Sequence, residues 1–219
     1  MNEIRRLEEK VKKLERWKKN IMSIEKRIQE IANTSDMSSV KTLKRIQDAL
    51  IRTHNILGDV VELGCFQGVT TRFMCEVLKG LESHKRVHVY DSFQGVPEAT
   101  VEDEGSALDI PDGACCSSFQ KFASTFEGAD FPLPFVNPGW FEDTCPQQLP
   151  DRISMAFLDG DRYSSMIVSL ETVIPKMSKN GIVIMHDYAC LEGAKKAVNE
   201  HKHKFSVFHE EGNQAWAVI

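Results

Sequence analysis

Residues 60–68 constrain the fold of this chain more than any other stretch. They read Val-Val-Glu-Leu-Gly-Cys-Phe-Gln-Gly, an apolar run that ends in an acid and passes into a turn with two glycines. Residues 69–78 follow at once and have the composition of a helix. A strand, a glycine-bearing loop and a helix in this order surround the polar end of a ligand with backbone N–H groups and a positive helix end. The stretch therefore predicts a ligand-binding α/β unit.

The alternation of strand and helix continues along the chain. Apolar segments of strand length occur at residues 86–91, 135–136, 153–159, 181–187, 205–209 and 215–219. Helical patterns occur at residues 117–126, at 163–177 with an end near 178–181, and at 193–204. This order predicts an α/β fold with a doubly wound, mostly parallel sheet, closed by an antiparallel pair at the C-terminal end.

The N-terminal segment has a different pattern. Its apolar residues recur every three or four positions, at Ile4, Leu7, Val11, Leu14, Trp17, Ile21, Ile24, Ile28 and Ile31. Such spacing predicts a long helix with one stammer in a near-heptad repeat. Two alternatives stay open: the helix binds a partner, such as a second copy in a homodimer, or it packs on its own domain. We divide the chain into a helical extension (1–36) and an α/β domain (37–219), whose first helix begins at Ser38 or Ser39.

Composition excludes several classes of protein. No apolar run approaches the roughly 18 residues that would suggest a membrane span, and the charged N-terminal segment does not resemble a signal peptide. The first 33 residues hold ten basic and six acidic residues, whereas the remainder holds 17 and 26. An acidic main body is a poor surface for nucleic acid. The six cysteines form no C-x-x-C pair, so we expect a cytoplasmic protein with reduced thiols.

Residues 94–134 form a long irregular insertion, rich in Gly, Pro, Asp, Glu and Ser. Insertions of this length in compact domains are often functional. We expect it to act as a lid over a site, although a mobile loop without a role is the alternative.

Four predicted strands end in acids or in acid-bearing turns, namely Glu62, Asp91, Asp159 and Asp187. Parallel strands bring their carboxyl ends to one edge of the sheet, so these carboxylates should gather there. They repel one another unless a cation or a hydroxyl-rich ligand compensates. Asp91 follows Gly68 by 23 residues, a spacing typical of an acid that accepts hydrogen bonds from ribose hydroxyls.

The spacing of the glycines distinguishes between cofactors. A dinucleotide site needs G-x-G-x-x-G, whereas Gly64 and Gly68 are separated by three residues and preceded by Glu62. That acid would repel a pyrophosphate but not a cationic ligand. The chain also contains no G-x-x-x-x-G-K-[ST] motif for a nucleoside triphosphate. S-adenosylmethionine, with its sulfonium, ammonium and ribose, suits an acid, a close turn and a ribose-binding acid.

Five motifs together resemble the macrocin O-methyltransferase family. They lie at residues 62–68, 90–97, 139–144, 158–165 and 186–188. Members of this family are class I methyltransferases with a Rossmann-like fold that methylate sugar hydroxyls with the help of a divalent metal. The resemblance covers roughly residues 55–205 and leaves the N-terminal helix outside.

The resemblance implies a set of cofactor-binding residues. Glu62, Gly64 and Gly68, with Cys65 and Phe66 between the glycines, would lie at the methionine end of S-adenosylmethionine. Asp91 and the adjacent Ser92 would lie at the ribose. Trp140 and Phe141 would lie near the adenine.

The resemblance also implies the catalytic groups. Asp159 would be a metal ligand together with His186 and Asp187, and Asp161 would be the general base. The family usually has two aspartates where this chain has His186 and Asp187. Carboxylate oxygens suit Mg²⁺ or Mn²⁺, whereas an imidazole favours Mn²⁺ or later transition metals. Alternatively, His186 is the base and no metal takes part.

We therefore expect an S-adenosylmethionine-dependent O-methyltransferase. Its substrate would be a small molecule or glycan, methylated on a hydroxyl of a deoxysugar such as rhamnose. One alternative is methylation of a phenolic or catechol substrate. The other is a non-catalytic scaffold built on a degenerate methyltransferase fold.

Overall fold

The computed structural model describes residues 2–34 and 38–219. Its strands are β1 (Asp59–Leu63), β2 (Val87–Asp91), β3 (Phe135–Pro138), β4 (Ile153–Leu158), β5 (Met177–Met185), β6 (Val207–Glu211) and β7 (Gln214–Val218). They form one sheet in the order β3-β2-β1-β4-β5-β7-β6. β1 to β5 pair in parallel, and β7 runs antiparallel to β5 and β6. The predicted α/β fold with a mostly parallel sheet is confirmed.

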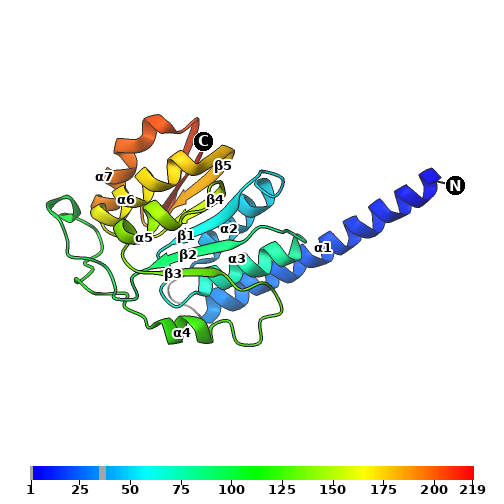
Figure 1. The fold of residues 1–219 in the computed structure, drawn as a ribbon, viewed down its shortest axis with the longest axis horizontal. Helices are drawn as coiled ribbons and strands as arrows, with labels where there is room; N and C mark the ends of the chain where they lie inside the picture. The colour runs from blue at the N-terminus through cyan, green and yellow to red at the C-terminus, as the bar shows by residue number, and fades with distance from the viewer. Residues whose placement is uncertain (1, 35–37) are drawn as a thin grey trace.

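Helices cover both faces of this sheet (Figure 1). They are α1 (Asn2–Thr34), α2 (Val40–Arg52), α3 (Val69–Gly80), α4 (Phe119–Ser124), α5 (Phe141–Gln148), α6 (Tyr163–Val173) and α7 (Glu192–His201), with short 3-10 turns η1 (Val101–Asp103), η2 (Ile174–Lys176) and η3 (Lys202–Lys204). α1, α2 and α3 share one buried apolar cluster, and α5, α6 and α7 share the other. All six residues of β4 are buried between the two layers. A strand covered on both faces needs a continuous apolar run, which is how β4 reads in the sequence.

Two segments that contain proline differ from the prediction. α6 ends at Val173 rather than near residues 178–181, and β5 already begins at Met177. Pro175 lies in the intervening turn η2, and proline in a helix interior removes a hydrogen bond and clashes with the preceding turn. The sequence analysis predicts no helix at residues 141–148, where the structure has α5 with Pro146 inside it.

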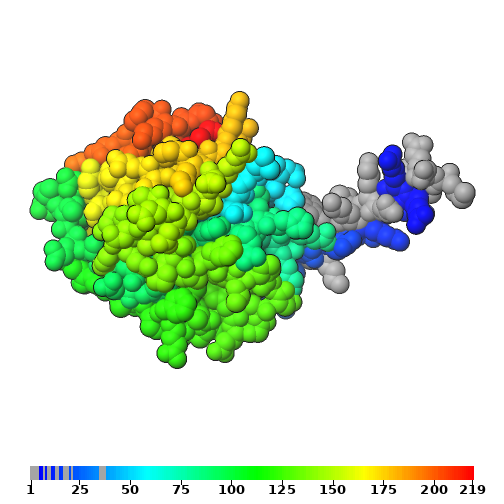
Figure 2. All heavy atoms as spheres, viewed as in Figure 1, coloured from blue at the N-terminus to red at the C-terminus, as the bar shows by residue number. Residues whose placement is uncertain are grey.

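The helix α1 has two parts with different surroundings. Ile24, Ile28 and Ile31 are buried in the cluster shared with α2 and α3. The earlier turns extend away from the domain (Figures 1 and 2), and the Val11 side chain is 55% exposed. The predicted apolar stripe also includes the side chains of Ile4, Leu7, Leu14, Trp17 and Ile21, which lie outside the described residues. The second half of the helix thus packs on its own domain. None of the described helices has the length and apolar character to span a membrane.

The register of the central strands brings their carboxyl ends level. Leu63 pairs with Tyr90 on one side and with Leu158 on the other, and Leu158 pairs with Met185. The residues that follow these positions therefore lie side by side along one edge of the sheet. The predicted site residues of four strands meet at this edge.

Candidate active site

A cavity of about 960 Å³ opens beyond the carboxyl ends of the central strands. The predicted site residues that line it are Gly64, Cys65, Phe66, Asp91, Ser92, Trp140, Phe141, Asp159, Asp161, His186 and Asp187. Glu62 and Gly68 do not line it. The volume lies at the upper end of the roughly 300–1,000 Å³ typical of small-molecule sites, which leaves room for a cofactor together with an acceptor.

The loop after β1 passes very close to the end of β4. Gly64 has a φ of +88°, and a Cβ on it would lie 2.1 Å from the carbonyl oxygen of Asp159. Only glycine fits there, because a side chain would meet both backbone strain and a backbone atom. Gly64 therefore connects the residues expected to bind the cofactor with those expected to act on the acceptor.

Asp91 fixes the shape of the same loop. Its Oδ2 accepts hydrogen bonds from the backbone N–H of Cys65 (2.8 Å) and of Phe66 (3.1 Å). Its Oδ1 accepts one from Phe93 N–H at 2.7 Å. A carboxylate offers about four acceptor positions, so Asp91 keeps room for about one further hydrogen bond, such as one from a ribose hydroxyl.

Glu62 lies behind the cavity wall and is fully buried. Its carboxyl oxygens accept hydrogen bonds from the hydroxyls of Thr70 and Thr71 in the first turn of α3. Burial raises the pKa of Glu62 to about 8, against the opposing effect of the two hydroxyls. Thr70 lines the cavity, so Glu62 acts on it only through α3.

Ser92, Trp140 and Phe141 form the adjoining wall. Ser92 Oγ donates to the Gly95 carbonyl (3.1 Å) and accepts from Gln94 N–H (3.0 Å), which fixes the turn after β2. Trp140 is the residue immediately before α5, and Phe141 is its first residue. Both side chains line the cavity and present aromatic surface next to the loop that Asp91 organises.

The insertion (residues 94–134) closes one side of the cavity and is tied to the domain at several points. Asp103 Oδ1 accepts from Tyr163 N–H (2.8 Å), and Ser106 Oγ accepts from Glu192 N–H (3.0 Å). These groups satisfy the free N–H groups at the starts of α6 and α7. At the other end, a Cβ on Gly68 would lie 2.7 Å from the Phe122 ring of α4, which explains why Gly68 does not face the cavity.

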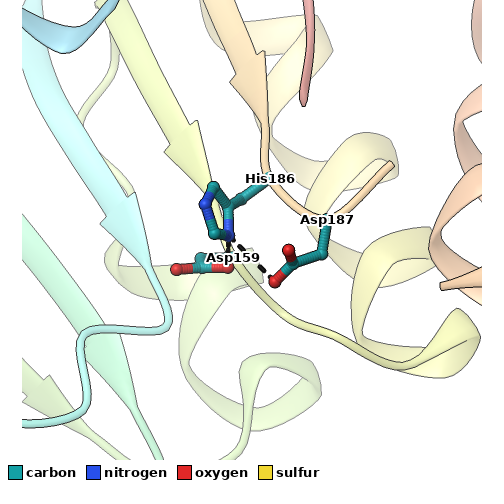
Figure 3. A group of neighbouring side chains, drawn as sticks. All are labelled: Asp159, His186 and Asp187. Carbon is teal, nitrogen blue, oxygen red and sulfur yellow. Dashed lines mark hydrogen bonds and ion pairs between the residues drawn. The ribbon is translucent and has the colours of Figure 1, made fainter. Parts of the chain in front are cut away.

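An imidazole lies between two carboxylates at the ends of β4 and β5 (Figure 3). His186 Nδ1 is 2.9 Å from Asp159 Oδ1 and 2.9 Å from Asp187 Oδ2. One oxygen or nitrogen atom from each of these three residues falls within 4.8 Å of the others. Among the described residues, this is the one group of acids, histidines and cysteines close enough to share a metal ion. The predicted metal-binding trio is thus brought together, and two oxygens with one nitrogen form a donor set that fits a divalent cation.

The fold and this geometry can be compared with known proteins. The chain matches the macrocin O-methyltransferase (TylF) family over residues 6–211. The protein belongs to this family. Its members are S-adenosylmethionine-dependent methyltransferases, so the predicted donor and the predicted type of enzyme are confirmed at this level.

Named relatives agree with the family. Demethyldecarbamoylnovobiocin O-methyltransferase of Streptomyces niveus is 32% identical over 188 residues, which cover 82% of this chain and 72% of the relative. The 8-demethyl-8-(2,3-dimethoxy-alpha-L-rhamnosyl)-tetracenomycin-C 4'-O-methyltransferase of Streptomyces olivaceus is 31% identical, over 78% of this chain and 69% of the relative. The solved structure of the O-methyltransferase NovP superposes with a TM-score of 0.73 at 28% identity, covering 82% of this chain and 80% of that one.

Electrostatics at the Asp159–His186–Asp187 centre favour a charged imidazole. Burial alone would lower the pKa of His186, but the charges and hydrogen bonds of Asp159 and Asp187 raise it to about 11. Burial raises the pKa of Asp187, but the hydrogen bond and the charge of His186, together with hydrogen bonds from Cys190 and Asn213, outweigh burial, so the net pKa is lowered.

Asp161, the predicted base of the O-methyltransferase, lines the cavity beside this centre. It has a φ of +59°, a left-handed conformation that Asp and Asn adopt more readily than most residues. Burial, followed by the nearby charges of Asp159 and Asp187, raises the pKa of Asp161 well above its ordinary value. A carboxyl group with a raised pKa is a stronger base than an exposed aspartate.

Several cavity residues of the O-methyltransferase were missed by sequence reasoning. They come from the start of α2 and from the β6–β7 turn, namely Ser39, Lys41, Thr42, Asn213 and Gln214. Thr42 Oγ1 lies 3.4 Å from His186 Nε2, although 144 residues separate the two in the chain. No motif marks these positions, because their proximity depends on how α2 and the hairpin pack against the parallel sheet.

Proposed function

We propose that this O-methyltransferase transfers the methyl group of S-adenosylmethionine to a hydroxyl of a sugar, such as a deoxysugar in a glycan or a glycosylated natural product. The relatives support a sugar acceptor: one is named for a rhamnosyl 4'-position, and another, of Micromonospora griseorubida, is the mycinamicin III 3''-O-methyltransferase. The observation that carries the proposal is that one continuous cavity is lined both by Asp91 and its loop and by the Asp159–His186–Asp187 centre.

The donor would lie along the loop after β1. Asp91 would accept a hydrogen bond from the ribose, and the backbone of Gly64, Cys65 and Phe66 would surround the methionine part. Trp140 and Phe141 would contact the adenine. Placing the sulfonium methyl in line with an acceptor oxygen is itself a large contribution to rate, up to about 7–11 kcal/mol in ideal cases.

A divalent cation fits the centre formed by Asp159, His186 and Asp187. When bound, such a cation lowers the pKa of a coordinated hydroxyl and orients it. The single imidazole among the ligands favours Mn²⁺ or a later transition metal over Mg²⁺, which prefers oxygen ligands and keeps several waters. Asp159, His186 and Asp187 would hold the cation, with His186 Nδ1 free of its hydrogen.

Asp161 would take the proton of the acceptor hydroxyl. Such general-base catalysis typically contributes about 10²–10⁴-fold to rate. His186 is poorly suited to that task. Both of its ring nitrogens already have partners, Nδ1 in Asp159 and Asp187 and Nε2 in Thr42.

Two measurements test the function. Calorimetric titration should show binding of S-adenosylmethionine, and absence of binding with and without Mn²⁺ or Mg²⁺ would refute the proposal. A panel of sugars and catechols, read by the mass gain of one methyl group, should then give products with sugars. Methylation of catechols alone would instead support the phenolic alternative.

The cation has a separate test. A chelator should abolish turnover, and added Mn²⁺ should restore it. Full activity in excess chelator would refute the cation and favour the alternative in which His186 is the base.

The alternative that α1 binds a partner, such as a second copy in a homodimer, is part of this proposal. Residues 24–31 belong to the core of the domain, so a deletion must stop before them. Removing residues 2–15 should lower the solution mass from that of a dimer to that of a monomer without changing the binding of S-adenosylmethionine. An unchanged mass would remove α1 from the interface.

A further inference from the structure

His186 presents its two ring nitrogens to different parts of the protein. Nδ1 lies between Asp159 and Asp187, whereas Nε2 faces Thr42 Oγ1 at 3.4 Å. A flip of the ring about the Cβ–Cγ bond would replace Nδ1 by a carbon and withdraw Nε2 from Thr42. The contacts at both nitrogens together therefore define one orientation of the imidazole.

The hydroxyl of Thr42 is suited to accept a hydrogen bond from His186. It has one proton and two acceptor positions. Gln214 Nε2 donates to one acceptor position. Ser39 Oγ lies 2.9 Å away and already accepts the backbone N–H of Thr42, so it can also accept the Thr42 hydroxyl proton. When Ser39 accepts the Thr42 hydroxyl proton, the acceptor position that remains on Thr42 faces His186 Nε2 and can accept a hydrogen bond from it.

Thr42 and Gln214 are themselves held rigidly. Both are buried, with 2% and 5% of their surface exposed. Arg45 of α2 forms an ion pair with Glu211 at the end of β6, and Lys41 Nζ lies 3.7 Å from the same carboxylate. Asn213, in the turn between β6 and β7, donates a hydrogen bond to Asp187 Oδ1. The β6–β7 turn thus contacts α2 and the centre at the same time.

We propose that Thr42, oriented by Gln214, is a positioning residue that keeps a hydrogen on His186 Nε2 and directs Nδ1 at the space between Asp159 and Asp187. Neither residue contacts the reacting atoms. They act on the centre from outside the parallel sheet, through the edge of the imidazole that faces away from the carboxylates.

The orientation of His186 by Thr42 should also affect how tightly a divalent cation binds, a step that rests on the proposed function. A histidine ligand binds a metal through a nitrogen without a hydrogen, and a hydrogen bond from its other nitrogen fixes the tautomer and the ring orientation. With a hydrogen held on Nε2, Nδ1 is the nitrogen available for binding. Loss of such an outer partner typically weakens metal affinity by about 10–100-fold.

Thr42→Val and Thr42→Ser separate the hydroxyl from the shape of the side chain. The Val variant keeps the branched shape and loses the oxygen, whereas the Ser variant keeps the oxygen. The first measurement uses metal-free protein with ¹⁵N-labelled histidine, in which the His186 signals are identified by their loss in His186→Asn. The hydrogen on Nε2 should be seen in the wild-type protein and in Thr42→Ser, and its signal should shift or disappear in Thr42→Val. Unchanged His186 signals in Thr42→Val would overturn the proposal.

The second measurement is the affinity for Mn²⁺ by calorimetry. Thr42→Val should bind Mn²⁺ about 10–100-fold more weakly than the wild-type protein, whereas Thr42→Ser should stay within a few-fold and the affinity for S-adenosylmethionine should not change. Equal Mn²⁺ affinity in Thr42→Val and the wild-type protein would overturn the role toward the cation. If the wild-type protein binds no Mn²⁺, the proposed cation site fails, and the histidine spectra alone decide the positioning role.

Two further variants distinguish a specific effect on His186 from a general loss of stability. Thr53→Val removes another buried hydroxyl at the end of α2, where Thr53 Oγ1 donates to the Ala49 carbonyl at 2.7 Å, far from the cavity. It should leave the His186 signals unchanged. If Thr42→Val does not fold, Gln214→Met tests the same contact, since it removes the donor to Thr42 without altering α2. It should produce the same loss of the Nε2 signal, and an unaltered signal there would also count against the proposal.

Discussion

At the β1–β2 end of the cavity the carboxylates are held by uncharged groups, whereas at the β4–β5 end they share a cation. Asp91 is surrounded by backbone N–H groups, and Glu62 by two hydroxyls. Asp159 and Asp187 instead lie on either side of the His186 imidazole. Fixed uncharged donors give a rigid shape, while a shared proton can be exchanged for another cation. Under the proposed function, the donor would bind at the first end and the acceptor would be activated at the second.

The two ends also differ in how far apart their partners lie in the chain. Glu62 contacts residues eight and nine positions later, and Asp91 contacts residues 25 and 26 positions earlier. Behind His186, Thr42 lies 144 residues earlier in the chain, and the partner of Thr42, Gln214, lies 172 residues after Thr42. The donor end is thus built within one strand–helix–strand unit, and the acceptor end needs the whole sheet.

The largest effect should come from Asp161, which belongs to the acceptor end alone. Asp161→Asn preserves the left-handed backbone conformation and removes the base, so kcat should fall by about 10²–10⁴-fold. The affinity for S-adenosylmethionine should stay as in the wild-type enzyme. Asp109→Asn, a second acid that lines the cavity from the insertion, is the matched control and should keep its activity. Equal rates for Asp161→Asn and the control would remove Asp161 from the reaction.

At Asp91 we expect a smaller effect, on the affinity for S-adenosylmethionine rather than on kcat. A hydrogen bond to a charged group contributes about 1.5–3 kcal/mol, so Asp91→Asn should weaken S-adenosylmethionine binding by about 10–100-fold. Mn²⁺ affinity, measured in parallel, should not change. Asp59→Asn alters a partly buried acid at the other end of β1 and serves as the control. A loss of Mn²⁺ affinity in Asp91→Asn would show that the two ends are not independent.

His186→Asp replaces the imidazole by a carboxylate, so that all three side chains of the centre offer oxygen ligands. Oxygen ligands suit Mg²⁺, so the preference for Mn²⁺ over Mg²⁺ should decrease, by about tenfold in the ratio of the dissociation constants. Competition calorimetry with the two ions measures this ratio. An unchanged ratio would mean that the imidazole does not contribute to metal selection.

The smallest effect concerns Glu62 and appears in stability. The pKa of Glu62 in the folded protein is about 8, above the ordinary value of 4.5, so its contribution to stability is fully present below pH 4.5 and is lost as the pH rises through 8. Glu62→Gln removes this titration. Relative to the wild-type protein, its free energy of unfolding should rise between pH 6.5 and 7.5 by at most about 1.4 kcal/mol, as measured in urea. A difference that is independent of pH would show that the pKa of Glu62 in the folded protein lies below about 6.5.

The central sheet, and most of the residues around the loop after β1, could be predicted from the sequence. Apolar runs and glycine turns are local signals, and parallel strands have to bring Gly64, Asp91 and Asp159 to one edge. Local signals misplaced the end of α6 and missed α5, since Pro175 lies in the turn η2 whereas Pro146 lies inside a helix. The expected role of Glu62 at the cofactor stays a prediction, and in the structure its carboxylate is bonded to Thr70 and Thr71 of α3.

The surroundings of His186 could not be predicted from the sequence and depend on the tertiary structure. Its contacts with Thr42, and through Thr42 with Gln214, join the first helix of the domain to the last hairpin. Hydrogen bonds between groups so distant in the chain depend on the packing of α2 and of the antiparallel β7 against the sheet. Packing of this kind leaves no periodic trace in the sequence, because each contact needs one side chain at one position rather than a repeated pattern.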